Sequence, residues 1–165
     1  MKSPYAFLDS LGISYTKHEH PALFTVEQAK EHYHKMPGGH TKNLFLRNKN
    51  GDKHYLVIVE SLKKTDLDWL KKYFQESKLS FASPERLMKY LGLTPGAVSA
   101  LGLINDENHE VRVLVDTDLF KLETIYAHPN VNTATLGIPK EGFRKFLENV
   151  GNHVEYARVE ERTDK

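Results

Sequence analysis

Apolar residues recur along the chain at two spacings, one typical of amphipathic helices and one typical of buried strands. The helical spacing, with capping residues at its ends, predicts helices at residues 4–11, 25–32, 66–75, 83–92 and 139–150. Alternating or wholly apolar runs predict strands at residues 13–18, 43–47, 54–59, 101–105, 111–116, 124–127, 133–137 and 153–159. Helices and strands do not alternate strictly. We therefore predict an α+β (mixed α/β) single domain over residues 1–165, with helices flanking a mixed, mostly antiparallel sheet of about seven strands.

The strands at 43–47 and 54–59 are joined by a segment that contains Asn50-Gly51. An Asn-Gly pair between two apolar runs predicts a β-hairpin. The second of these strands is almost wholly apolar before Glu60, which predicts a central strand buried on both faces.

Composition narrows the class of protein. The 165 residues are 39% hydrophobic and 27% charged, which is typical of a globular domain, and the absence of cysteine excludes disulfides and thiol nucleophiles. A net charge of only +1 excludes a broad basic surface for polyanions. No apolar stretch approaches the roughly 18 residues of a membrane span, and the N-terminus lacks a signal-peptide pattern. We therefore expect a cytoplasmic protein with no membrane partner.

The first candidate site is a glycine-rich loop that leads into an apolar strand, Gly38-Gly39-His40-Thr41-Lys42-Asn43. A partly buried lysine can stabilise an oxyanion or a phosphate, and its pKa is easily lowered. A lysine on a strand edge with its head in water explains the same local pattern. The glycine spacing does not fit a phosphate-binding P-loop.

The second candidate is Gly92-Leu93-Thr94-Pro95-Gly96-Ala97-Val98-Ser99, whose small residues leave backbone N–H groups able to face a ligand oxyanion. A helix cap followed by a crossing loop explains the same segment, and both interpretations can hold together. Ser99 has no nucleophile-elbow motif around it.

The third candidate runs from Tyr126 to Thr135 and contains His128, Asn130 and Asn132. These neutral hydrogen-bonding groups can orient a water, an α-amino group or a ribose hydroxyl. A polar loop rich in turn-forming residues explains them equally well.

The remaining histidine and lysine clusters carry less information. His18-Glu19-His20 and His32-Tyr33-His34 have no third ligand at a suitable spacing, so we expect no metal site and no cofactor. Lys63-Lys64 and Lys71-Lys72 fit a solvated surface, and they are also candidates for contacts with RNA phosphates.

The ordered triple of segments resembles the YbaK/ProX family of aminoacyl-tRNA editing domains over essentially the whole chain. The segment from Gly39 to Leu46 is similar to the family's lysine segment, residues 91–99 to its glycine-proline loop, and residues 128–133 to its late polar segment. Leu91 stands where the YbaK branch usually has the glycine of Gly-x-x-x-Pro, which favours the free-standing ProX/PrdX branch.

The resemblance implies a trans-editing hydrolase that deacylates mischarged tRNA, Ala-tRNA(Pro) first, without a metal and without a covalent enzyme intermediate. It implies the acceptor end of tRNA(Pro) as binding partner and prolyl-tRNA synthetase as a possible second one, and it leaves the oligomeric state open. Under this hypothesis Lys42 acts electrostatically at the ester or at the terminal phosphate, and amides around Gly96 and Ala97 face the carbonyl oxygen. His128 orders a water and binds the aminoacyl end. The expected substrate-binding residues are Asn43, Phe45, Pro95, Val98, Tyr126, Asn130 and Asn132.

Phe45, Val98 and Tyr126 are expected to limit the pocket to a small side chain, so that Pro-tRNA is excluded by size. Size exclusion is needed because favourable apolar contact alone discriminates one methylene by only about 1–3 kcal/mol. Three alternatives stay open from the sequence. The first is the same chemistry on Cys-, Ser- or Thr-charged tRNA, and the second is a non-catalytic module that binds tRNA or a synthetase. The third is a sensor that binds a free amino acid in the same pocket.

Overall fold

A mixed β-sheet forms the centre of the chain, which is described by a computed structural model over residues 2–21 and 39–163. The described strands are β1 (Thr16–Glu19), β2 (Gly39–Asn48), β3 (His54–Glu60), β4 (Leu79–Phe81), β5 (Val111–Asp116), β6 (Thr124–Ala127), β7 (Ala134–Pro139) and β8 (Val154–Ala157). Their order is β1-β7-β6-β2-β3-β5-β8, with β4 paired to the end of β2. Four pairings are antiparallel, and the β2–β6, β3–β5 and β5–β8 pairings are parallel. The predicted mixed single-domain architecture is confirmed.

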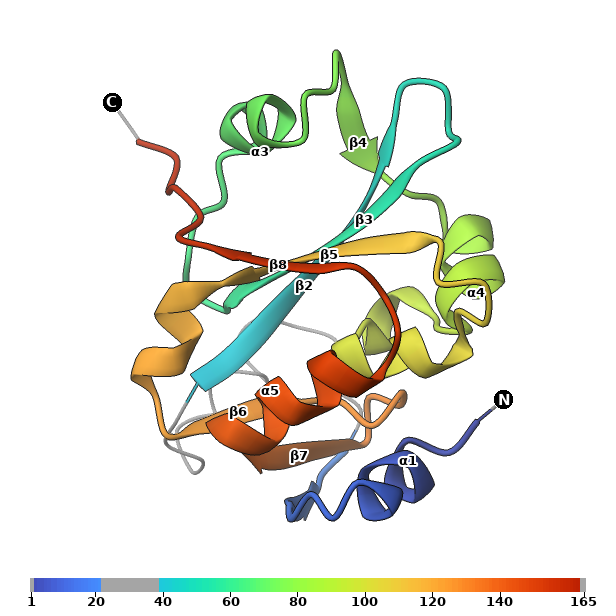
Figure 1. Cartoon of the computed structure of the whole chain (residues 1–165), viewed down its shortest axis with the longest axis vertical. Helices are drawn as coiled ribbons and strands as arrows, with labels where there is room; N and C mark the ends of the chain where they lie inside the picture. Colours follow the sequence, from blue (N-terminus) through green and yellow to red (C-terminus); the bar gives the residue numbers. More distant parts are fainter. Residues whose placement is uncertain (1, 22–38, 164–165) are drawn as a thin grey trace.

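Two hydrophobic clusters lie on opposite faces of the central strands. Side chains of a strand alternate between faces, so Phe45 of β2 and Leu56 of β3 belong to the cluster under α4 and α5. Their neighbours Leu44 and Val57 belong to the cluster that faces α3. Figure 1 shows α3 on one side of the central strands and α1, α4 and α5 on the other. Both faces of β2 and β3 are therefore covered, as the apolar run in β3 predicted.

The predicted hairpin is confirmed. β2 and β3 pair in antiparallel register, with Leu46 opposite Tyr55. Gly51 has φ of +72°, a left-handed conformation that glycine adopts without strain.

The described helices begin and end close to the predicted positions. They are α1 (Pro4–Ser10), α3 (Leu67–Tyr73), α4 (Pro84–Leu91) and α5 (Lys140–Asn149). The side chain of Ser83 caps the N-terminus of α4, and Gly92 ends the helix at φ of +66°. The helix predicted to start at Thr25 lies outside the described residues.

One predicted strand is wrong, because the chain from Ala100 to Asn105 is a 3-10 helix, η2. The side chain of Ser99 accepts a hydrogen bond from the Leu101 N–H and starts this helix. A Cβ on Gly102 would lie 2.5 Å from Leu93, so the helix packs against residue 93 at a distance that only glycine allows. A short, fully apolar segment carries no periodicity that separates a strand from a helix.

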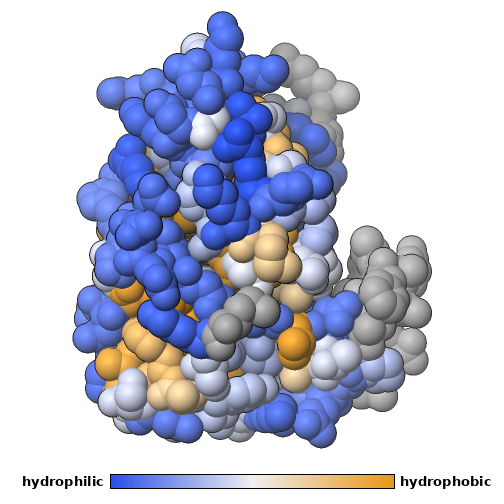
Figure 2. Space-filling view, turned by 90° about the vertical axis from the view of Figure 1, so that its right-hand side faces the viewer, coloured by the Kyte–Doolittle hydropathy of each residue, from blue (hydrophilic) through white to orange (hydrophobic). Residues whose placement is uncertain are grey.

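One face of the molecule is mainly hydrophilic (Figure 2). No helix of the described residues is long and apolar enough to cross a membrane. The face at the right of Figure 1 is mainly hydrophilic, with apolar side chains in separate patches (Figure 2).

Candidate functional site

The three segments singled out in the sequence meet beside β2. The Asn43 Nδ2 donates to the Val98 carbonyl at 3.5 Å, which joins the strand to the glycine-proline loop. A Cβ on Gly96 would lie 3.4 Å from the Asn132 Nδ2, which places the late polar segment against the same loop. Contacts between segments so far apart in sequence confirm that they lie together in the fold.

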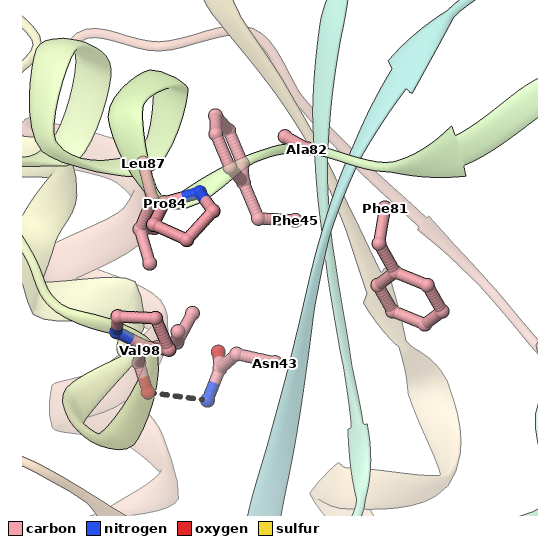
Figure 3. A pocket seen from close by; sticks show the side chains of 8 residues that line it. Asn43, Phe45, Phe81, Ala82, Pro84, Leu87 and Val98 are labelled. Carbon is pink, nitrogen blue, oxygen red and sulfur yellow. Dashed lines mark hydrogen bonds between the residues drawn. The ribbon is translucent and has the colours of Figure 1, made fainter.

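One cavity of about 320 Å³ lies on one face of β2 (Figure 3), and we call it the main cavity because it holds most of the expected substrate-binding residues. Four of the expected substrate-binding residues line it, namely Asn43, Phe45, Pro95 and Val98. The other lining residues are Phe81, Ala82, Pro84 and Leu87, which the sequence did not single out as ligand-binding. Leu87 was predictable only as part of the apolar face of α4, and Phe81 carried no motif at all.

Asn43 is the polar group best placed to contact a ligand in this cavity. Its Oδ1 is buried and makes no hydrogen bond within the described part of the chain. A buried amide oxygen without a donor costs free energy, on the order of 1–3 kcal/mol. A ligand that brings an N–H or O–H group into the cavity would satisfy it.

The glycine-proline loop forms a 3-10 turn, η1 (Pro95–Ala97). The Ala97 N–H donates to the Thr94 carbonyl at 2.9 Å, and the Ala97 side chain is buried. This N–H is therefore already used inside the turn, and the expected role of Ala97 as an oxyanion donor does not fit this geometry. Gly96 is exposed on the same turn, next to Asn132.

Lys42 lies on the opposite face of β2 from Asn43, because adjacent strand residues point to opposite faces. It lines a second cavity of about 270 Å³, with Lys64, Thr65, Arg162 and the apolar residues Leu44, Leu67 and Phe81. Lys42 therefore does not line the cavity that contains Asn43. Burial lowers the pKa of the Lys42 ammonium, Glu60 opposes this shift, and Arg162 adds to it.

The Lys42 Nζ donates to the Lys63 carbonyl at 2.5 Å. Lys63 itself is buried, and its ammonium forms ion pairs with Asp116 at 2.6 Å and Asp118 at 3.0 Å. It also donates to the Val159 carbonyl at 2.8 Å. The carbonyl that holds Lys42 is therefore anchored by a buried ionic cluster, so Lys63 has a structural role here and does not belong to a solvated surface.

His128 lies at a third, much smaller cavity of about 10 Å³, which it lines with His40, Thr41, Tyr126, Ala127 and Thr135. This volume is close to that needed for one water molecule. The His128 Nδ1 is 3.1 Å from the Ala134 carbonyl, an acceptor, so Nδ1 donates and Nε2 is left as the acceptor of a neutral ring. Burial lowers the His128 pKa, the bond to Ala134 opposes this shift, and His20 adds to it.

The remaining predicted residues have different positions. Tyr126 stacks on His40 with ring centroids 4.5 Å apart and does not line the main cavity. Asn130 has φ of +67°, a turn conformation that asparagine tolerates better than most residues. The His128 cavity is lined by His40 and Thr41, at the start of β2, and the main cavity by Asn43 and Phe45, further along the same strand.

The fold and these cavities define a small single-domain protein with one mainly apolar cavity, in which the Asn43 Oδ1 is unsatisfied within the described residues, and a second cavity lined by Lys42. A family model described as "Aminoacyl-tRNA editing domain" matches residues 20–146. The chain therefore belongs to the aminoacyl-tRNA editing domain family.

Two curated relatives agree with this assignment. The chain is 42% identical over 147 residues to the "Prolyl-tRNA editing protein ProX" of Acetoanaerobium sticklandii, covering 89% of this chain and 90% of that protein. It is 33% identical over 138 residues to the "Prolyl-tRNA synthetase associated domain-containing protein 1" of Bos taurus, covering 81% and 80% of the two chains.

A solved structure supports the fold alone. It is described as a candidate trans-editing enzyme for prolyl tRNA synthetase, with a TM-score of 0.73 and 19% sequence identity. The match covers 95% of this chain and 94% of that chain.

Proposed function

We propose that this protein is a trans-editing hydrolase that removes a wrongly attached amino acid from tRNA, with Ala-tRNA(Pro) as its first substrate. Family membership supports the reaction class, and the relative from Acetoanaerobium sticklandii, named as a prolyl-tRNA editing protein, supports the tRNA. The observation that carries the proposal is the main cavity, where Asn43 presents an unsatisfied acceptor beside the turn that holds Gly96.

An aminoacyl ester is already activated, so positioning a water and stabilising the developing oxyanion are sufficient for hydrolysis. Asn43 accepts a hydrogen bond from the α-amino group or from a ribose hydroxyl of the substrate. Neutral His128 orders a water through its Nε2, in the small cavity that it lines. Lys42 acts from the other face of β2, where its positive charge attracts the anionic end of the substrate.

The size of the main cavity does not by itself select the amino acid that is removed. A cavity of about 320 Å³ exceeds what a methyl side chain needs, so Phe45 and Val98 alone do not restrict it to alanine. The same chemistry on Cys-, Ser- or Thr-charged tRNA is therefore the second candidate. A module that binds tRNA without hydrolysis is the third.

A panel of tRNA(Pro) charged with Ala, Cys, Ser, Thr or Pro tests these candidates through the first-order rate of deacylation. We expect the wild type to accelerate loss of alanine and to spare Pro-tRNA(Pro). Asn43→Ala and Lys42→Ala should each lower kcat/KM by about 10-fold or more, since a hydrogen bond to a charged group contributes about 1.5–3 kcal/mol. Asn50→Ala, at the exposed tip of the hairpin, is the matched control.

Undiminished activity in Lys42→Ala would contradict the electrostatic role proposed for Lys42. Tight tRNA binding by the wild type without turnover on any member of the panel would identify a binding module. Faster removal of cysteine, serine or threonine than of alanine would reassign the substrate and leave the reaction class unchanged.

A further inference from the structure

The buried ammonium of Lys63 contacts three segments that are distant from it in sequence. It forms ion pairs with Asp116 at the end of β5, at 2.6 Å, and with Asp118 in the 3-10 helix η3 (Thr117–Lys121), at 3.0 Å. It also donates to the Val159 carbonyl, in the segment after β8, at 2.8 Å. Lys63 and Asp116 are 6% and 0% exposed. The position of the Lys63 side chain is therefore fixed by three acceptors, none of which neighbours it along the chain.

This ionic cluster keeps Lys63 and Asp118 charged at neutral pH. Burial alone would lower the Lys63 pKa, but the hydrogen bonds and charges of Asp116 and Asp118 raise it. Hydrogen bonds from Lys63 and Lys121 lower the Asp118 pKa to about 2. Asp116 also accepts from the N–H groups of Asp118 and Val159, at 3.2 and 3.3 Å. The carboxylates are therefore bound to the backbone of their own segments as well as to Lys63.

A buried ionic cluster does little for stability that an apolar cluster would not do. Taking charges out of water costs free energy, which ion pairing offsets, and apolar side chains of similar volume are often as stable in the same place. Hydrogen bonds are directional, however, whereas apolar burial is not. What the cluster adds is therefore a defined position for the segment that carries Lys63.

That segment is the turn from Glu60 to Lys63, which follows β3 and lies beside the start of β2. The Lys63 N–H donates to the Glu60 carbonyl at 3.0 Å and closes the turn, and the Ser61 N–H donates to the His40 carbonyl of β2 at 2.7 Å. The Glu60 carboxylate accepts from the Leu62 N–H at 3.0 Å. The turn is thus tied to β2 near one end and to the ionic cluster at the other.

The ammonium of Lys42 is held by this turn. Its Nζ donates to the carbonyl of Lys63, the residue whose side chain enters the cluster. Glu60 and Arg162 also act on the charge of Lys42. A lysine side chain is a flexible chain of four carbons, so its ammonium takes many positions unless an acceptor holds it. The place of the Lys42 charge therefore depends on how firmly the Lys63 carbonyl is fixed.

We propose that Asp116 and Asp118 are positioning residues for the deacylation: through Lys63 they hold the carbonyl that places the Lys42 ammonium. This inference rests on the proposed function, because it assumes that Lys42 acts on the substrate. Neither carboxylate lines the cavity that contains Lys42. Their effect on the reaction therefore passes through Lys63 and Lys42.

A double-mutant cycle tests whether the carboxylates act through Lys42. Asp116→Asn keeps the shape of the side chain and removes one charge. On alanylated tRNA(Pro) it should lower kcat/KM by about fivefold, less than Lys42→Ala does, because the ammonium is displaced and not removed. In a chain that already carries Lys42→Ala, the same substitution should change kcat/KM by less than about twofold, since no ammonium is left to position.

A second variant and a control complete the cycle. Asp118→Asn, at a less buried carboxylate, should behave as Asp116→Asn does, and it tests the proposal even if Asp116→Asn does not fold. Glu123→Gln breaks the ion pair between Lys140 and an exposed carboxylate at 3.2 Å, and it should leave kcat/KM unchanged.

Equal fold-losses with and without Lys42→Ala would overturn the proposal, because a general structural defect acts in both backgrounds. Unchanged kcat/KM in both carboxylate variants would overturn it as well.

If the wild type deacylated no member of the tRNA panel, the proposed function would fail, whereas the hold of the cluster on Lys42 would still be measurable by NMR. The order parameter of the Lys42 Cε methylene should be lower in Asp116→Asn than in the wild type, because its ammonium has lost a fixed acceptor. The exposed Lys49 should show no change. Equal order parameters for Lys42 in the two proteins would show that the cluster does not position it.

Discussion

His54 is a buried histidine on β3 that packs against Phe45, one of the residues that line the main cavity. Its ring lies between Tyr90, at a centroid distance of 4.1 Å, and Phe45, at 5.6 Å. Its Nε2 is 3.0 Å from the Arg86 Nη1, so the neutral ring accepts a hydrogen bond from the guanidinium. Burial, with the nearby positive charges of Arg86 and Arg47, lowers the His54 pKa from 6.5 to about 4.

This shift predicts a loss of stability in acid. In the unfolded chain His54 takes up a proton as the pH falls below 6.5, whereas the folded protein keeps the ring neutral until about pH 4. The free energy of unfolding should therefore fall across this window, by roughly 3 kcal/mol from His54 alone. His54→Gln keeps an acceptor for Arg86 and removes the titration, so its stability should depend less on pH. Urea unfolding at several pH values between 7 and 4 measures this; equal slopes in both proteins would refute it.

Helix α4 positions one wall of the main cavity through Pro84 and Leu87. It has only eight residues, so its ends contribute a large share of its stability. The Ser83 Oγ accepts a hydrogen bond from the Arg86 N–H at 3.2 Å, which satisfies a donor of the first turn.

Loss of this cap should destabilise the protein measurably. Ser83→Ala is expected to lower the free energy of unfolding by about 1 kcal/mol. Ser77→Ala, at an exposed position outside the helices, should leave it unchanged. Chemical denaturation of the two variants beside the wild type makes the comparison, and equal stabilities would show that the cap contributes nothing.

The C-terminal segment joins parts of the molecule that are distant in sequence. Val159 is 1% exposed, its N–H donates to Asp116 at 3.3 Å, and its carbonyl accepts from Lys63. The Glu160 carbonyl accepts from the Asp66 N–H at 3.3 Å, just before α3. The segment therefore holds the loop that carries the Lys63 carbonyl, the acceptor of Lys42.

Truncation tests this connection at the scale of the whole molecule. A chain that ends at Arg158 loses the buried Val159 and one acceptor of Lys63, so its free energy of unfolding should fall by about 2 kcal/mol or more. A chain that ends at Thr163 keeps these contacts and should be more stable than the chain that ends at Arg158. Thermal unfolding of both chains gives the answer, and matching midpoints would contradict the anchoring role.

The sequence by itself determined the features that depend on neighbouring residues. The caps at Ser83 and Gly92, the Asn50-Gly51 turn and the apolar run of β3 act over a few positions, so their helices and hairpin were predictable. The order of the three polar segments also identified the family. The wholly apolar run from Ala100 was ambiguous, because its packing partner, and not its local pattern, makes it a 3-10 helix.

Only the tertiary structure decided which residues share a cavity. One cavity is lined by Asn43, Phe45, Pro95 and Val98, as the motifs implied. Tyr126 instead stacks on His40, and Lys42 lies on the other face of β2. Lys42 thereby gained Lys64, Thr65 and Arg162 as neighbours, which no local pattern connects with it. The physical reason is that adjacent side chains of a strand point to opposite faces of the sheet. Packing between segments that are distant in sequence then determines which residues each side chain contacts.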